Sequence, residues 1–111
     1  MVEFKIPLYG GTVKVFNNKD EFNSEYEELE LEELNMEGFK GVTQKIFLED
    51  ESLVFMVGVF DGKINTLAHE CTHVGIYIAD HTGWVINDNT SEPFCYLVDY
   101  ILEQSLPVLK D

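Results

Sequence analysis

The feature that most constrains the fold is the longest apolar run of the chain, Leu53 to Phe60. The run has the length of a strand and falls far short of the roughly 20 apolar residues that cross a bilayer. An apolar run without polar alternation is typical of a strand buried on both faces. The chain has 111 residues, of which 45% are hydrophobic, enough for one core. We therefore expect a single domain over residues 1–111, with this strand in its core.

Alternating apolar and polar residues predict three further strands. Val2–Leu8 and Thr12–Phe16 alternate on either side of a Gly-Gly turn and suggest a β-hairpin. Val42–Leu48 alternates as well and is separated from Leu53–Phe60 by the polar turn at residues 49–52, so these two strands could form a second hairpin.

Apolar residues at helical spacing predict three helices. They begin after capping residues, which are Asn18 or Asp20 for the first helix, Asn65 or Thr66 for the second, and Ser91 for the third. They end near residues 35–38, near residues 80–83 and at Pro107. The order β-β-α-β-β-α-α predicts an α+β fold with a small mixed or antiparallel sheet.

The net charge of −14, from 21 acidic and 7 basic residues, excludes some partners. Binding to nucleic acid or to an anionic membrane surface requires clustered Lys and Arg, so we expect neither. Much of the acid lies in Glu21–Glu37, which we interpret as a solvated helix face. An acidic protein could also imitate DNA, which we keep as an alternative.

The N-terminal residues lack the basic and then apolar pattern of a secretion signal, so we expect a cytoplasmic protein. The two cysteines, Cys71 and Cys95, do not make a disulfide framework. We expect them to be small packing residues on helices.

The most informative motif for function is His69-Glu70-Cys71-Thr72-His73. On a helix, residues four apart lie on the same face, so both imidazoles can bind one metal ion. Glu70 points slightly off this pair, where it can reach a water on the metal. The pattern H-E-x-x-H on a helix therefore predicts a Zn²⁺ site with Glu70 as general base.

A catalytic zinc usually has three protein ligands and an open position, so a third ligand must come from elsewhere in the chain. Glu92, at the start of the last predicted helix, is the first candidate. The alternatives are His81, Asp88, Cys95 and Asp99.

Hydrolysis would also need a donor to the developing oxyanion. We take Tyr96 as the candidate catalytic residue and keep Tyr77, His81 and Tyr100 as alternatives. The strand at residues 53–60 could offer an edge to an extended peptide. Trp84, Phe94 and Tyr96 could line an apolar specificity pocket.

Residues 66–73 followed by residues 91–97 resemble the gluzincin branch of zinc metallopeptidases. With the turn Gly58-Val59-Phe60-Asp61-Gly62, they look like the short zincin-like peptidases of tailed phages and prophages. The resemblance covers roughly residues 57–102 and implies His69, His73 and Glu92 as ligands, Glu70 as base, and, for a phage protein, the host cytoplasm. Larger gluzincins carry an aspartate four residues after the ligand glutamate, where this chain has Tyr96.

The sequence thus predicts a zinc-dependent metallohydrolase that acts on a protein or peptide substrate. Two alternatives remain: a zinc-binding interaction or inhibitor protein of phage origin with weak turnover, and an acidic DNA mimic. The sequence does not determine the substrate or the oligomeric state.

Overall fold

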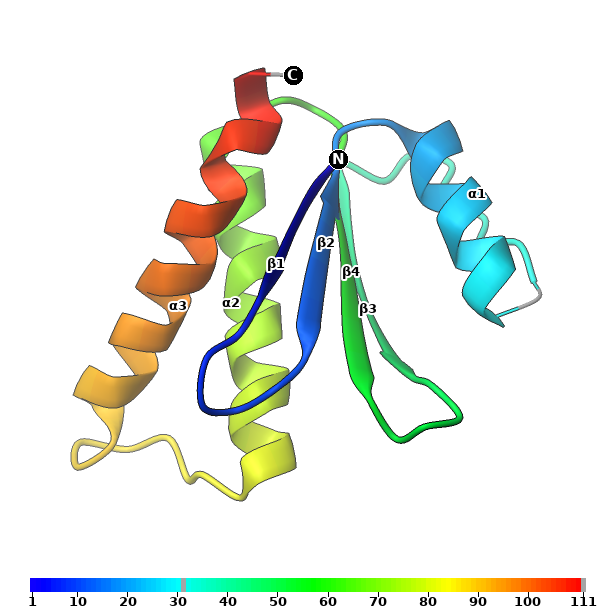
Figure 1. The fold of residues 1–111 in the computed structure, drawn as a ribbon. Coiled ribbons are helices and arrows are strands. Elements are labelled where there is room, and N and C mark those ends of the chain that lie inside the picture. The colour runs from blue at the N-terminus through cyan, green and yellow to red at the C-terminus, as the bar shows by residue number, and fades with distance from the viewer. Residues whose placement is uncertain (31, 111) are drawn as a thin grey trace.

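The computed structural model describes residues 1–30 and 32–110, which form one sheet with helices on both faces (Figure 1). The strands are β1 (Val2–Lys5), β2 (Thr12–Phe16), β3 (Gly41–Phe47) and β4 (Leu53–Val59). The helices are α1 (Lys19–Glu30), α2 (Ile64–Thr82) and α3 (Ser91–Ser105), and a 3₁₀ helix, Leu106–Lys110, follows α3. The α+β class and the order of the elements are as predicted.

The four strands lie in the order β1-β2-β4-β3. Both predicted hairpins form, β1 with β2 and β3 with β4, and a parallel pairing of β2 with β4 joins them into a mixed sheet. All seven residues of β4 are buried, as its apolar run predicts. Because β4 is paired on both sides, however, it cannot offer an edge to a peptide, and that expectation was wrong. The edge strand next to β4 is β3.

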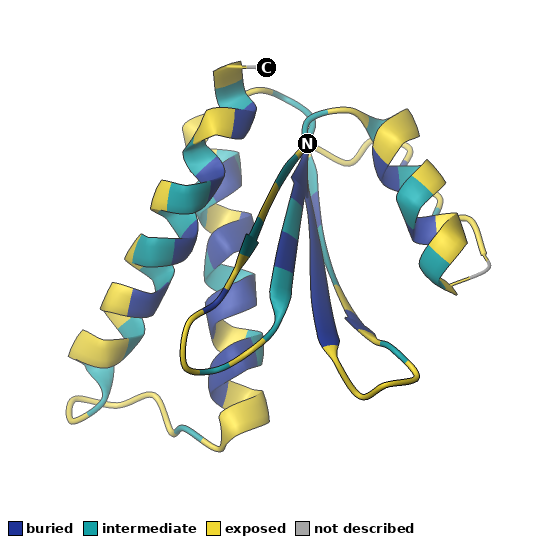
Figure 2. Ribbon diagram, in the orientation of Figure 1, coloured by how far each residue is buried: buried dark blue, intermediate teal, exposed yellow. Residues whose placement is uncertain are grey.

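Each face of the sheet has its own core (Figure 2). On one face, alternate residues of β2 and β4, such as Val15 and Val57, pack against α2 and α3. On the other face, Val54 and Met56 pack with Phe22 of α1. The unbroken apolar run of β4 is therefore explained by helices on both sides of it.

Helix α1 begins as predicted, with the Asn18 Oδ1 atom accepting a hydrogen bond from the Glu21 N–H at 3.0 Å. It ends at Glu30, earlier than the predicted end at residues 35–38. Its last turn carries Glu27, Glu28 and Glu30 and no basic residue. Carboxylates are unfavourable at the negative end of the helix dipole, which gives a physical reason for the early end.

The predicted caps of the other two helices were wrong. Helix α2 begins at Ile64, directly after Lys63, because the Asp61-Gly62 turn leads the chain from β4 straight into the helix. Thr66 lies inside α2, and its hydroxyl donates to the Asp61 Oδ2 atom at 2.6 Å. The N-cap of α3 is Thr90 rather than Ser91.

Among the described residues, no helix combines the length and the apolar content needed to cross a bilayer.

Candidate metal centre

The two motif histidines lie one turn apart on α2, on the side of the helix that faces away from α3. Their Nε2 atoms are 3.2 Å apart, and their ring planes are inclined at 74°. His69 is exposed and His73 is partly exposed. Both nitrogens are therefore accessible from solvent and converge on one point.

This spacing fits two ligands of one zinc ion. Two Zn–N bonds of about 2.05 Å that meet at a tetrahedral angle place their nitrogens about 3.3 Å apart. A hydrogen bond between two neutral imidazoles has a similar length, so the distance fits the metal without requiring it. Among the described residues, His69, Glu70 and His73 are the one group of three potential metal ligands, with their ligand atoms within 4.8 Å of one another.

Glu70 of α2 is 7% exposed, and its side chain lies between α2 and β3. Its Oε1 atom accepts a hydrogen bond of 2.7 Å from the Thr43 hydroxyl of β3. The carboxylate is thus held close to the histidine pair, with a ligand atom of each of the three residues within 4.8 Å of the others.

Helix α2 approaches β3 closely at Gly41. A Cβ atom at this position would lie 2.8 Å from the Thr66 Cγ2 atom and 2.9 Å from the Glu70 Oε2 atom. Only glycine leaves room there for the carboxylate of Glu70.

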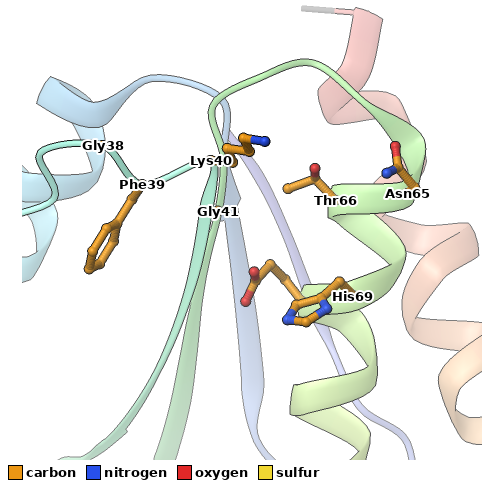
Figure 3. Close-up of a pocket in the computed structure, with 8 residues that line it drawn as sticks. Gly38, Phe39, Lys40, Gly41, Asn65, Thr66 and His69 are labelled. Carbon is orange, nitrogen blue, oxygen red and sulfur yellow. The ribbon is translucent and has the colours of Figure 1, made fainter.

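A pocket of about 490 Å³ opens beside this contact, lined by Gly38–Gly41, Asn65, Thr66, His69 and Glu70. Figure 3 shows Phe39 and Lys40 on one side of it and Thr66 and His69 of α2 on the other. The candidate site is therefore a pocket between the first turns of α2 and the segment that leads into the edge strand β3.

Beyond the pocket, side chains of α2 and β3 contact one another. Tyr77 stacks on His73 with ring centroids 6.3 Å apart. The Lys45 Nζ atom lies 5.3 Å from the centroid of the Tyr77 ring, and Phe47 contacts His81. Of the residues considered as oxyanion donors, Tyr77 is the one whose ring contacts a motif histidine.

The structure does not bring Glu92 to the histidine pair. Helices α2 and α3 are antiparallel, so the first turn of α3 lies beside the end of α2 (Figure 1). His73 is nine residues before that end, Thr82, which corresponds to about 13 Å along the helix axis. Helix α3 also packs on α2 at Gly75, which lies on a different side of α2 from the histidines.

The alternative ligands also lie away from the pair. His81 is two turns beyond His73 on α2, and its ring lies against Phe47. Asp88, Cys95 and Asp99 are exposed, in the loop before α3 and on α3 itself. Among the described residues, none of these side chains joins the group formed by His69, Glu70 and His73.

Tyr96 lies on α3 and is 69% exposed. With Pro93 and Tyr100 it lines a separate pocket against the end of β1, so it does not face the motif histidines. The expected apolar specificity pocket does not form either. Trp84 packs edge to face on Tyr9 instead, with ring centroids 5.1 Å apart, and Phe94 packs near Gly75.

Three residues of the site were missed from the sequence, namely Gly41, Thr43 and Lys45. All lie on β3, more than 20 positions before the motif, and reach it only because β3 packs beside α2. The one available signal was weak: Thr43 and Lys45 are polar residues on one face of an alternating strand.

We found no match to this chain among protein-family models, curated proteins or solved structures.

Proposed function

We propose that this protein is a zinc-dependent metallohydrolase that cleaves amide bonds in a peptide or protein substrate. The observation that supports this best is the convergence of three groups, the two imidazole Nε2 atoms 3.2 Å apart and the Glu70 carboxylate within 4.8 Å of them. The resemblance of residues 66–73 to gluzincins points to the same chemistry.

His69 and His73 would hold the metal, and Glu70 would act as the base. A bound Zn²⁺ acts as a Lewis acid that polarises a substrate carbonyl. It also lowers the pKa of a bound water towards neutral pH. Glu70 would take the proton of the attacking water and pass it to the leaving amine. The hydrogen bond from Thr43 would keep the carboxylate in place for both transfers.

The edge of β3 is the surface on which we expect the substrate to lie. The Phe60 N–H donates to the Lys40 carbonyl, and the Leu48 N–H donates to the Ser52 carbonyl. Since hydrogen-bonded pairs alternate along an antiparallel ladder, the backbone groups of Thr43 and Lys45 point to the open edge. A peptide that adds to this edge as a further strand would run past Glu70 and the histidines.

Two histidines are fewer protein ligands than a catalytic zinc usually has. Among the described residues no third ligand reaches the pair other than Glu70 itself. We therefore expect a chelator to remove the metal more readily than from a site with three ligands, and the protein should be loaded with Zn²⁺ before its metal content is measured.

The first test is the metal content of the zinc-loaded, untagged protein by elemental mass spectrometry. We expect about one zinc per chain, lost in His69→Ala and kept in Glu70→Gln. His81→Ala is the matched control, because His81 lies on the same helix but away from the pair. Zinc bound equally by the parent and by His69→Ala, or no zinc in the parent, would contradict the proposal.

The second test is cleavage of a complex peptide mixture, read by mass spectrometry. The parent protein should generate new peptide termini, and Glu70→Gln should reduce the rate about 10²-fold to 10⁴-fold while its zinc content stays unchanged. Zinc binding without any cleavage would instead favour the zinc-binding interaction protein.

A further inference from the structure

Lys45 places a positive charge on the edge strand β3, beside Tyr77. Its Nζ atom lies 5.3 Å from the centroid of the Tyr77 ring and 5.7 Å from that of Phe47. Tyr77 in turn stacks on His73. Two aromatic rings thus hold the ammonium group one side chain away from the proposed metal site, and cation–π contacts of this kind fix its position.

Among the described residues, this charge has no acidic partner. The chain has 21 acidic residues for 7 lysines, and among the described residues Lys14 is the lysine that forms ion pairs, with Glu25 and Glu3. In residues 1–30 and 32–110, by contrast, neither Lys45 nor Lys40 forms an ion pair with a carboxylate. Lys40 lines the pocket beside His69 and Glu70. Two unpaired cations therefore border the path that we propose for the substrate.

The densest acidic segment lies on the other side of the sheet. Helix α1 and the residues after it pack on the face opposite to α2. Charges further apart than the Debye length, about 8 Å at physiological ionic strength, are largely screened. Lys45 can therefore attract a negative group locally in spite of the net charge of −14.

The positions of Thr43 and Lys45 on β3 determine which residue of an added peptide strand would lie opposite Lys45. Thr43 and Lys45 are two residues apart on β3 and share the face that α2 covers, since Thr43 binds Glu70 and Lys45 contacts Tyr77. In an added strand, the residue opposite Lys45 is two positions from the residue opposite Thr43. Side chains directly opposite each other interact, and opposite charges stabilise the pair.

We propose that the open edge of β3 prefers an acidic peptide, with Asp or Glu at the position that pairs with Lys45, two residues from the one opposite Thr43. If the acidic peptide is the substrate, the proposal rests on the proposed hydrolase function. The binding of an acidic peptide can be tested without turnover.

The test is an NMR titration of the isotope-labelled Glu70→Gln protein with three blocked peptides, Thr-Val-X-Val-Thr with Glu, Gln or Lys at X. The single variable residue lets the peptide slide until X pairs with Lys45. We expect shifts at the β3 amides and at Tyr77, and a Kd about two- to fivefold lower for the Glu peptide than for the Gln peptide. The Lys peptide should bind most weakly.

Lys45→Glu should reverse this order, so that the Lys peptide binds most tightly. Lys110→Glu is the matched control, because Lys110 is an exposed lysine in the 3₁₀ helix, and it should leave the order unchanged. The amide spectrum reports whether each variant is folded. Equal Kd values for the three peptides, an order that Lys45→Glu does not change, or no shifts along β3 would overturn the inference.

The two proposals fail in different ways. A preference for Glu that depends on Lys45, in a protein that cleaves nothing, would contradict the hydrolase and leave the acidic-peptide site standing. Cleavage by the parent protein without a charge preference in the titration would contradict only the acidic-peptide site.

Discussion

Glu70 owes its position to residues of β3 that lie far from it in the chain. Thr43, which is 27 residues earlier, donates to its carboxylate, and Gly41 leaves the space that the carboxylate occupies. The candidate base is thus buried, yet held by a hydrogen bond that satisfies one of its oxygens. The side chains on β3 consequently matter as much for the site as those on α2.

Gly41→Ala should disturb this contact directly. The added Cβ would lie 2.8 Å from the Thr66 Cγ2 atom, 2.9 Å from the Glu70 Oε2 atom and 3.0 Å from the Gly58 carbonyl oxygen. We expect the free energy of unfolding, measured with urea, to fall by about 1–3 kcal/mol.

Thr66→Ser provides the control for Gly41→Ala. It removes the nearest methyl group but keeps the hydroxyl that donates to Asp61. The double variant should therefore recover part of the lost stability. A Gly41→Ala protein as stable as its parent would contradict the close packing of α2 on β3 at Gly41.

The two cysteines should differ sharply in reactivity. Cys71 is buried against Ser105, and its burial raises the pKa of the thiol to about 11. At pH 8 only about one Cys71 side chain in a thousand is then the reactive thiolate, and this fraction rises as the pH approaches 11. Cys95 is exposed.

We therefore expect a disulfide reagent at pH 8 to label one thiol per native chain and both thiols after unfolding. Cys95→Ser should abolish the labelling of the native protein. Two thiols that react at the same rate in the native state would argue against the buried position of Cys71.

At the scale of elements, the pairing of α2 with α3 decides which part of α3 can approach the histidines. The two helices meet closely at Gly75, where an added Cβ would lie 2.8 Å from the Val98 Cγ2 atom and 3.3 Å from the Phe94 ring. This contact covers a different side of α2 from the one that carries the motif. Helix α3 therefore stabilises α2 from the opposite side and leaves the side that carries His69 and His73 uncovered.

Gly75→Val should separate these helices. Two methyl groups would enter a space already filled by Val98 and Phe94, so we expect a loss of about 1–3 kcal/mol in the free energy of unfolding. Val98→Ala should restore part of it in the double variant, and a double-mutant cycle measures this coupling. Additive effects of the two substitutions would contradict the close contact.

At the scale of the whole molecule, the sheet separates two regions of different character. One face carries α2, α3 and the candidate site, and the other carries the acidic helix α1. Phe22 and Tyr26 of α1 are buried in the second core, while its carboxylates Glu27, Glu28 and Glu30 are exposed. The acidic segment is therefore part of the folded domain, and removing residues 21–37 would also remove core residues.

The net charge of −14 should make stability depend on salt. Repulsion among the carboxylates is screened as the Debye length shortens, so we expect the Tm to rise by a few degrees between about 20 mM and about 500 mM NaCl. Replacing Glu27, Glu28 and Glu30 by Gln should reduce this rise without touching the core. The same variant tests the DNA-mimic alternative better than removal of residues 21–37 does, because it removes acidic charge and keeps the core residues of α1. A Tm independent of salt would contradict the argument.

The sequence by itself determined the features that depend on residues close together in the chain. Periods of 2 and 3.6 residues located the strands and helices, and the spacing of four placed His69 and His73 on one side of α2. The apolar run of β4 predicted its burial because any strand covered on both faces needs apolar side chains on both.

Only the tertiary structure decided which of these elements meet. The alternation of β3 predicts a strand but not its place at the sheet edge, and the position of Glu92 on a helix does not tell in which direction that helix packs. The antiparallel packing of α3 carries Glu92 away from the histidines, whereas the order β1-β2-β4-β3 brings Thr43 to Glu70. These contacts join residues distant in sequence, so they arise from the packing of whole elements and leave no local pattern in the chain.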